Sequence, residues 1–279
     1  MYPHLANEWS KKKLQIKAEE VSPYSTQNVW WKCSVCGYEW QLMIRKRIKN
    51  SICPVCADKA VLTGVNDLTT TNHALLAEWD YKRNTSVTPE HMSKHSLRVV
   101  WWKCSRGHHF RARIADRAVD GEPCHICRKE FEKVFPDLLL REYINKSGFS
   151  VIEKEEDLIG IPLLCYIPEK RAVIEVSKPD YNLKDAYTRE CVKNILCKKK
   201  KIRLIRIIRK TDKDFRDCAC IRLFDYSDES LDEGIHLALK TLGIKVEGLG
   251  DKTSEENSGN ISESIKDRKQ RLFEKWLKS

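Results

Sequence analysis

The chain has 279 residues, with 51 Lys and Arg, 40 Asp and Glu, 12 Cys and a formal net charge of +11 at pH 7. No run of 18 apolar residues occurs, so no membrane-spanning helix is expected, and the first residues lack the basic and apolar segments of a secretory signal. Twelve cysteines without an export signal favour thiolate metal sites over a disulfide scaffold, which indicates a cytoplasmic protein without a membrane partner.

The first part of the chain is an internal repeat with a period of 71 residues. The sequence Trp-Trp-Lys-Cys at 30–33 recurs at 101–104, and the Cys-x-x-Cys pair at 53–56 recurs at 124–127. A fixed period that carries the same residue types indicates tandem copies of one small unit. We therefore expect two zinc-binding repeats, at residues 1–60 and 61–130.

Each repeat contains four residues with the spacing of a structural zinc site. Two Cys-x-x-Cys pairs in one small unit are typical of tetrahedral zinc coordination. The second repeat lacks one of these cysteines; His108 follows the glycine shared by both repeats and is preferred to His109, which takes the position of Glu39. Four protein ligands leave no open position, so both zinc ions should be structural. The predicted ligands are Cys33, Cys36, Cys53 and Cys56 in the first repeat, and Cys104, His108, Cys124 and Cys127 in the second.

The paired tryptophans should point to opposite faces of a strand. Trp31 and Trp102, next to ligand cysteines, are expected in the core of each unit. Their neighbours, Trp30 and Trp101, would either pack on the tryptophans at positions 9 and 79 or stack on a nucleic-acid base, and we favour packing.

Residues 1–130 resemble a zinc-ribbon or treble-clef repeat family of bacteria and their mobile elements. The similarity rests on Trp-Trp-Lys-Cys, a following glycine with an aromatic residue, an arginine about seven residues later, and Cys-Pro-x-Cys. The spacer Gly-Val-Asn-Asp-Leu at 64–68 and a Glu-Trp pair before each unit also match, whereas Cys124-His125 departs from Cys-Pro without changing a ligand. The resemblance implies small α+β units, each a zinc-bound hairpin and helix, often in tandem and often fused to a nuclease domain.

Positive charge is concentrated in these repeats. Residues 1–130 hold 21 Lys and Arg against 13 Asp and Glu, while the rest of the chain holds 30 against 27. Basic clusters between the ligand pairs would contact phosphates, which provide affinity without reading sequence; the alternative is ordinary solvated charge. We expect a nucleic-acid partner, with DNA favoured. The candidate contacts are Arg45, Lys46, Arg47, Arg111, Arg113 and Arg117.

Residues 131–245 are expected to form an α/β domain, a small mixed sheet with flanking helices. Apolar residues at helical spacing mark the helices, and short β-rich runs mark the strands. Pro136 is a candidate interruption of the first helix. In chain order, the patterns predict a helix at 129–147, strands at 150–153, 163–167 and 172–176, a helix at 185–200, a strand at 202–208 and a helix at 230–242.

This domain resembles the restriction-endonuclease-like fold, in particular the very-short-patch-repair-like nucleases. The similarity rests on two strands joined by an Ile-Pro turn at 166–175, the helix sequence Arg-Glu-Cys-Val-Lys-Asn at 189–194, and the strand at 201–207. The resemblance implies a Mg²⁺ site with an aspartate on the first strand opposite an acidic residue on the second. A short turn places Leu164 opposite Glu175, so the aspartate is missing. We therefore expect a nuclease fold with lost or severely reduced cleavage.

Two alternatives stay open. An active endonuclease would need a relocated Mg²⁺ site built from Glu142, Glu175 and Lys178, since a divalent ion requires several oxygen ligands. The competing interpretation of Glu175 is an ion pair with Lys193 or Arg189. The other alternative is an adaptor whose zinc units bind another protein.

The composition changes again after residue 245. Residues 246–264 are rich in Gly, Ser, Asn and acidic residues and predict an acidic flexible linker. Residues 265–279 predict a short amphipathic helix, which would dock on the core, bind a protein partner or stay loose. The cysteines outside the repeats lack ligand spacing and are expected to be bystanders.

Overall fold

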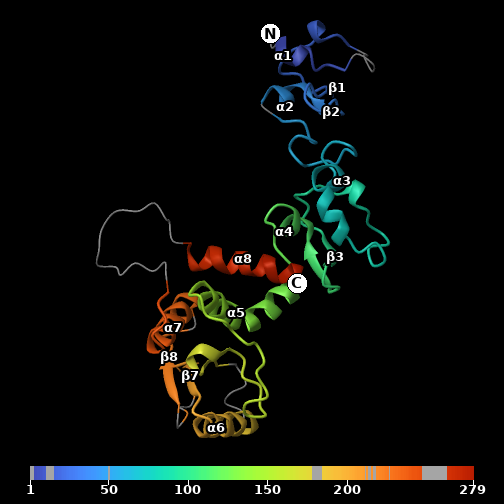
Figure 1. The fold of residues 1–279 in the computed structure, drawn as a ribbon. Coiled ribbons are helices and arrows are strands. Elements are labelled where there is room, and N and C mark those ends of the chain that lie inside the picture. Colours follow the sequence, from blue (N-terminus) through green and yellow to red (C-terminus); the bar gives the residue numbers. More distant parts are fainter. Residues whose placement is uncertain are drawn as a thin grey trace, which may run out of the picture. The chain divides into compact units, whose positions relative to one another are not determined.

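The computed structural model describes residues 3–10, 16–49, 51–177, 184–210, 212, 215, 218–225, 227–246 and 263–279. The chain forms two compact units, Met1–Ile126 and Cys127–Ser279 (Figure 1). The first unit contains the two hairpins of the repeats, and the second contains the sheet expected for the α/β domain.

The first repeat is built on an antiparallel hairpin. Its two strands pair Trp31 with Trp40 and Trp30 with Gln41, and side chains alternate between a buried and an exposed face. Trp9 adds an isolated bridge to Trp31, so the segment before the hairpin lies along its edge. The elements are α1 (Pro3–Ala6), η2 (Ala18–Glu20), β1 (Asn28–Lys32), β2 (Glu39–Met43) and α2 (Ile44–Ile48).

The second repeat has the same hairpin with equivalent pairings. Trp102 pairs with Phe110, Trp101 pairs with Arg111, and Trp79 makes the edge bridge to Trp102. An additional helical turn, N-capped by the Asp67 side chain, begins this repeat. The elements are α3 (Leu68–Thr71), η3 (His73–Glu78), η4 (Pro89–His91), β3 (Val99–Lys103), β4 (His109–Arg113) and α4 (Ile114–Ala118).

The second unit contains a four-stranded mixed sheet. The strand order is β5-β6-β7-β8, with β5 antiparallel to β6 and the other neighbours parallel. Such parallel pairs need a crossover, and α6 provides it between β6 and β7. The elements are α5 (His125–Lys146), β5 (Tyr166–Ile167), η5 (Pro168–Lys170), β6 (Ala172–Val176), α6 (Lys184–Lys199), β7 (Arg203–Ile208), β8 (Ala219–Arg222), α7 (Asp228–Thr241) and α8 (Ile265–Lys278).

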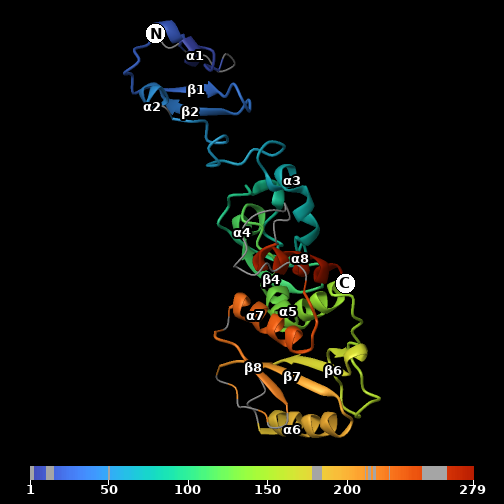
Figure 2. The ribbon, with the colours of Figure 1, turned by 60° about the vertical axis from the view of Figure 1, so that its left-hand side comes forward.

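Helices cover both faces of this sheet. Glu175 on β6 and Arg206 on β7 are register neighbours and contact Lys193 and Glu190 of α6. Ile207, the next residue on β7, points the other way and lies against Gly234 of α7. Figure 2 shows α6 on one side of the strands and α5 and α7 on the other. Because both faces are covered, the described residues of β6 are buried along its whole length.

The structure differs from the expected elements at four places. The strand expected at 163–167 is shortened to the two residues of β5. Pro136 lies inside an unbroken α5, so it does not interrupt the helix. The strand expected at 150–153 is reduced to an isolated bridge between Ile152 and Tyr166, because the charged residues that follow cannot enter a core. The strand β8 was not expected, since its short sequence Ala-Cys-Ile-Arg has only one β-branched residue.

The C-terminal helix α8 docks within the second unit. Leu272 and Phe273 are buried, and the Phe273 ring lies 5.0 Å from the ring of Phe131 on α5. Lys269 also pairs with Glu132 of α5 and Asp228 of α7. The open choice for this helix is thus decided in favour of docking, while a protein partner for it stays a prediction. The linker expected at 246–264 lies almost wholly outside the described residues.

Among the described residues, no helix has the length and apolar character needed to cross a membrane.

Candidate zinc centres and candidate nucleic-acid face

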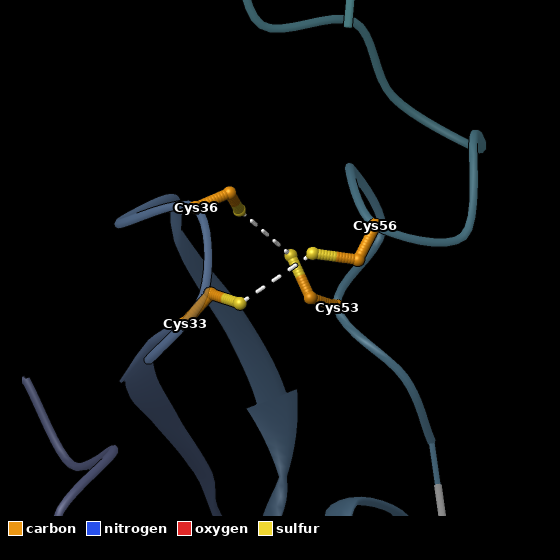
Figure 3. A group of neighbouring side chains, drawn as sticks. All are labelled: Cys33, Cys36, Cys53 and Cys56. Carbon is orange, nitrogen blue, oxygen red and sulfur yellow. Dashed lines mark hydrogen bonds between the residues drawn. The ribbon is translucent and has the colours of Figure 1, made fainter. Parts of the chain in front are cut away.

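Four cysteine sulfurs converge in the first repeat. Cys33 and Cys36 lie in the turn between β1 and β2, and Cys53 and Cys56 lie in a second turn after α2; Figure 3 shows the four side chains pointing at one another. The Sγ atoms of Cys33 and Cys56 are 3.6 Å apart, as are those of Cys36 and Cys53. A regular tetrahedron with Zn–S bonds of about 2.3 Å has S–S edges of about 3.8 Å. The sulfurs therefore already have the separation that a zinc ion requires.

Backbone geometry in the first ligand turn favours a thiolate at Cys33. Gly37 has a φ of +73°, a conformation that favours glycine, and its N–H donates to the carbonyl of Cys33. Burial raises the pKa of the Cys33 thiol, but hydrogen bonds to its sulfur from the backbone amides of Cys36 and Val35 outweigh this and lower the pKa to about 7. A lowered thiol pKa favours the thiolate, which is the form that binds metal.

The second repeat brings together three cysteines and one histidine. Ligand atoms of Cys104, His108, Cys124 and Cys127 all lie within 4.8 Å of one another. The Nδ1 of His108 is 3.9 Å from the Sγ of Cys124. The cluster thus contains His108, the histidine that the sequence analysis preferred to His109. His109 instead places its Nδ1 2.6 Å from a carboxylate oxygen of Asp80. Gly107 has a φ of +85° and repeats the role of the glycine in the first turn.

The tryptophan expectation is half right. Trp31 and Trp102 are buried, with 1% and 0% of their surface exposed. Trp9, however, packs edge-on against Trp31 at 5.3 Å, and Trp79 packs against Trp102 at 5.4 Å, so neither packs on the outward-facing tryptophan as expected. The edge bridges explain this, because directly paired residues point to the same face of a sheet.

Two of the candidate phosphate contacts are internal instead. Arg47 donates to the carbonyl of Ser51 and pairs with Glu8, and its guanidinium lies 5.9 Å from the Trp31 ring centroid. Arg117 repeats this arrangement in the second repeat with Glu78 and the Trp102 ring. These two arginines connect the segment before each hairpin to the core of its repeat. They have this structural role in place of the phosphate contacts expected for them.

The other two candidate arginines of the second repeat, Arg111 and Arg113, lie on an exposed face. Trp101, Arg111 and Arg113 share the outer face of β3–β4 with Lys103, because register partners and alternate residues point the same way. The guanidinium of Arg111 lies 5.8 Å from the Trp101 ring centroid, and that of Arg83 lies 4.7 Å from it. We call Arg83, Trp101, Lys103, Arg111 and Arg113 the basic face.

Sequence reasoning missed two members of the basic face. Lys103 could have been found from strand alternation, since it lies two residues after Trp101. Arg83 could not, because it follows the edge segment and reaches the ring only in the folded repeat.

On the described strands of the first repeat, the outward face carries less positive charge. On β1–β2 the outward residues include Lys32 and Glu39, which face each other and balance in charge, and Gln41 replaces the arginine opposite the tryptophan. The basic candidates of this repeat, Arg45 and Lys46, are exposed on α2 instead.

The two described candidate catalytic residues of the second unit, Glu175 and Glu142, have different ion-pair partners. Glu175 is 2% exposed; its Oε1 accepts a hydrogen bond from Lys193 Nζ at 2.9 Å, and its Oε2 lies 3.1 Å from Arg206 Nη1. The ion-pair interpretation with Lys193 therefore describes this carboxylate. The observed pairing of β5 with β6 covers only Tyr166–Val173 and Ile167–Ala172. Leu164 lies in a turn before β5, so the strand pairing expected between Leu164 and Glu175 is not formed. Two cations already occupy the oxygens that a Mg²⁺ ion would need.

Glu142 has other partners. It pairs with Lys146 one turn later on α5 and with Arg271 of α8. Burial raises the pKa of this carboxyl group, but hydrogen bonds from Arg271 and Lys146 outweigh the effect and lower it. The third candidate, Lys178, lies outside the described residues.

Residues 5–59 and 75–130 each match a family model described as a probable treble clef zinc finger domain. No curated protein matches the chain. Together with the two ligand clusters, the matches identify tandem zinc-binding treble-clef units.

Proposed function

We propose that the protein binds nucleic acid, with DNA favoured, and that the basic face of the second zinc-binding repeat makes the main contacts. The observation that carries this proposal is the gathering of four cationic side chains around one half-buried tryptophan on the exposed face of β3–β4. Asp80 is 5% exposed and pairs with His109, and its carboxylate also lies 3.6 Å from Arg83 Nε, so it balances part of the charge of Arg83.

Such a face suits a polyanion. Arginine and lysine side chains on a rigid hairpin contact successive phosphates, and the release of counterions makes this binding strongly dependent on salt. The arginine over the tryptophan ring is held in place by a cation–π contact. Arg45 and Lys46 on α2 would add further phosphate contacts from the first repeat.

Removing charge from the basic face should weaken binding. We expect the double variant Arg111→Gln/Arg113→Gln to lower affinity for duplex DNA and to reduce the slope of log K against log salt by about two, since each lost phosphate contact removes about 0.9. The measurement is fluorescence anisotropy of a labelled duplex over a salt series.

The matched control is Lys266→Gln/Lys275→Gln, which removes the same charge from exposed positions of α8. Equal losses for the two double variants would show a general charge effect and contradict a role for the basic face. Binding without salt dependence would contradict phosphate contacts altogether.

We further propose that the second unit is a nuclease-like domain without cleavage activity. The pairing of Glu175 with Lys193 and Arg206, and the leucine at position 164, support this. Plasmid DNA incubated with the protein and Mg²⁺ should stay intact. Mg²⁺-dependent cutting that Glu175→Gln abolishes would favour an active endonuclease.

A further inference from the structure

A group of cationic residues lies at one end of the sheet in the second unit. Residues 198–203 contain five basic residues and no acidic residue. The crossover helix α6 returns the chain to the start of β7, so its last turn lies at the end of the sheet where the parallel strands β6 and β7 begin. We call five exposed residues at this end the strand-start patch: Arg171, Lys199, Lys200, Lys201 and Arg203.

Hydrogen bonds hold the segments of the strand-start patch together. Arg203 is the register partner of Ala172, and its N–H donates to the carbonyl of Arg171 at 2.9 Å. The guanidinium of Arg171 donates to the carbonyl of Lys200 at 3.1 Å, which joins the turn before β6 to the end of α6. The patch is therefore built from three adjacent segments whose backbones are fixed to one another.

Two residues of the patch have backbone conformations that favour glycine. Arg171 has a φ of +43° and Lys201 has a φ of +54°, and this left-handed region is strained for residues that carry a Cβ atom. Each of them lies in the turn that leads into a strand. Glycine would close both turns with less strain, so the backbone conformation does not explain why each position carries a cation.

The helix dipole explains only part of this charge. Its negative end favours cations in the last turn of α6, such as Lys199, but Arg171 and Arg203 belong to other elements. Ion pairs do not balance the patch either, because no carboxylate among the described residues pairs with any of its five side chains. Glu169, the acidic residue nearest to Arg171 in the sequence, accepts a hydrogen bond from the N–H of Ser150 at 3.1 Å.

We propose that the strand-start patch is a second nucleic-acid contact, through which the second unit binds the phosphate backbone. Arginine and lysine make such contacts, whereas lysine is depleted from protein–protein interfaces. Lipid-binding surfaces commonly lie along one amphipathic helix, whereas this patch combines a turn, a helix end and a strand. The proposal rests on the proposed nucleic-acid binding of the chain, but it uses other residues in the other unit.

This contact is separate from the carboxylate to which the nuclease resemblance points. Glu175 lies near the end of β6 and is buried against Lys193 of α6, whereas the patch is exposed and lies where the strands begin. Two phosphate contacts on one chain increase the affinity, since the second contact is intramolecular once the first has formed. We therefore expect binding to depend on both surfaces.

The test is fluorescence anisotropy of a labelled DNA duplex with the zinc-loaded full chain over a salt series. Arg171→Gly/Lys201→Gly removes two charges and places glycine at the two positive φ angles, so the fold should be retained. We expect the slope of log K against log salt to fall by about two, and the affinity at about 0.1 M salt to fall by about tenfold or more. Combination with Arg111→Gln/Arg113→Gln should lower the slope by about four.

A second pair of substitutions tests the same surface without changing a strained residue. Lys199→Gln/Lys200→Gln should also lower the slope by about two. The control is Lys266→Gln/Lys275→Gln, which removes the same charge from exposed positions of α8 in the same unit and should have a smaller effect. Equal losses for this control and for the patch pairs overturn the proposal.

The remaining outcomes separate this proposal from the proposed function. Duplex binding that weakens in Arg111→Gln/Arg113→Gln but in neither patch pair overturns this proposal alone. Absence of duplex binding by the unaltered chain overturns both. Vesicles that contain phosphatidylserine provide the last comparison: if the patch pairs abolish vesicle binding and leave the affinity for DNA unchanged, the patch is a lipid contact and the proposal is wrong.

Discussion

Replacing Cys53 by serine should reduce the bound zinc from two ions to one per chain and unfold the first repeat. Cys53 is 3% exposed and its sulfur lies 3.6 Å from that of Cys36. Apparent binding free energies for structural zinc in small fingers are about 10–16 kcal/mol. The core of this repeat is small, and two of its buried members are themselves ligands, so packing alone should not keep it folded.

Elemental analysis of the purified protein provides the zinc count, and the tryptophan amide signals of the first repeat report its folding. Cys191→Ser is the control, because this half-buried cysteine belongs to neither cluster, and it should retain two zinc ions. Two zinc ions in Cys53→Ser would contradict the assignment. Cys124→Ser should have the reciprocal effect on the second repeat.

Replacing Glu175 by alanine should destabilise the second unit by about 3–5 kcal/mol, because it leaves buried cations without their main counter-charge. Arg206 is fully buried and Lys193 is 5% exposed. Glu190 remains near both, with Oε2 2.7 Å from Arg206 Nη2 and 3.5 Å from Lys193 Nζ, so part of the charge stays balanced. The loss should therefore lie toward the lower end of this range.

The measurement is urea unfolding followed by circular dichroism at a helix wavelength, since the long helices belong to this unit. Glu142→Ala is the matched control: it also removes one carboxylate, but from partners that are largely solvent-exposed, and should cost about 1 kcal/mol or less. A loss for Glu175→Ala no larger than this control would show that Glu175 is not an essential structural carboxylate.

The zinc ligands could be predicted because they depend on local spacing. Each ligand pair lies within one turn, and the repeat of the pattern removes most of the ambiguity. The fourth ligand of the second repeat required one comparison between copies, in which His108 follows the shared glycine. Spacing of this kind can be recognised in the sequence without knowledge of the tertiary fold.

The roles of the arginines could not be predicted in the same way. Arg47 and Arg45 are neighbours on a basic helix, yet Arg47 pairs with Glu8 while Arg45 is exposed. The partner lies 39 residues away in the sequence, and tertiary contacts such as the edge bridge of Trp9 hold that segment against the hairpin. A charge pattern alone does not distinguish an internal ion pair from a phosphate contact.

The sheet of the second unit shows a similar limit. Its long helices and its buried strands β6 and β7 follow from apolar periodicity, whereas the strand expected at 163–167 is only Tyr166–Ile167 and Leu164 lies in a turn. The strand β8 and the docking of α8 depend on tertiary contacts, such as that of Phe273 with Phe131. Their amphipathic or weakly apolar sequences permit several outcomes in isolation.

The contact between Phe131 and Phe273 also affects the order in which parts of the chain fold during synthesis. It joins residues 142 positions apart in the sequence, and contacts of this separation close late because a long loop must first be restricted. Each zinc cluster spans only 24 residues, from 33 to 56 and from 104 to 127. On the ribosome, the repeats can therefore fold while the rest of the chain is still being made. Part of α5 stays uncovered until α8 has been synthesised. A truncated chain that lacks α8 would therefore expose this apolar surface and be prone to aggregate.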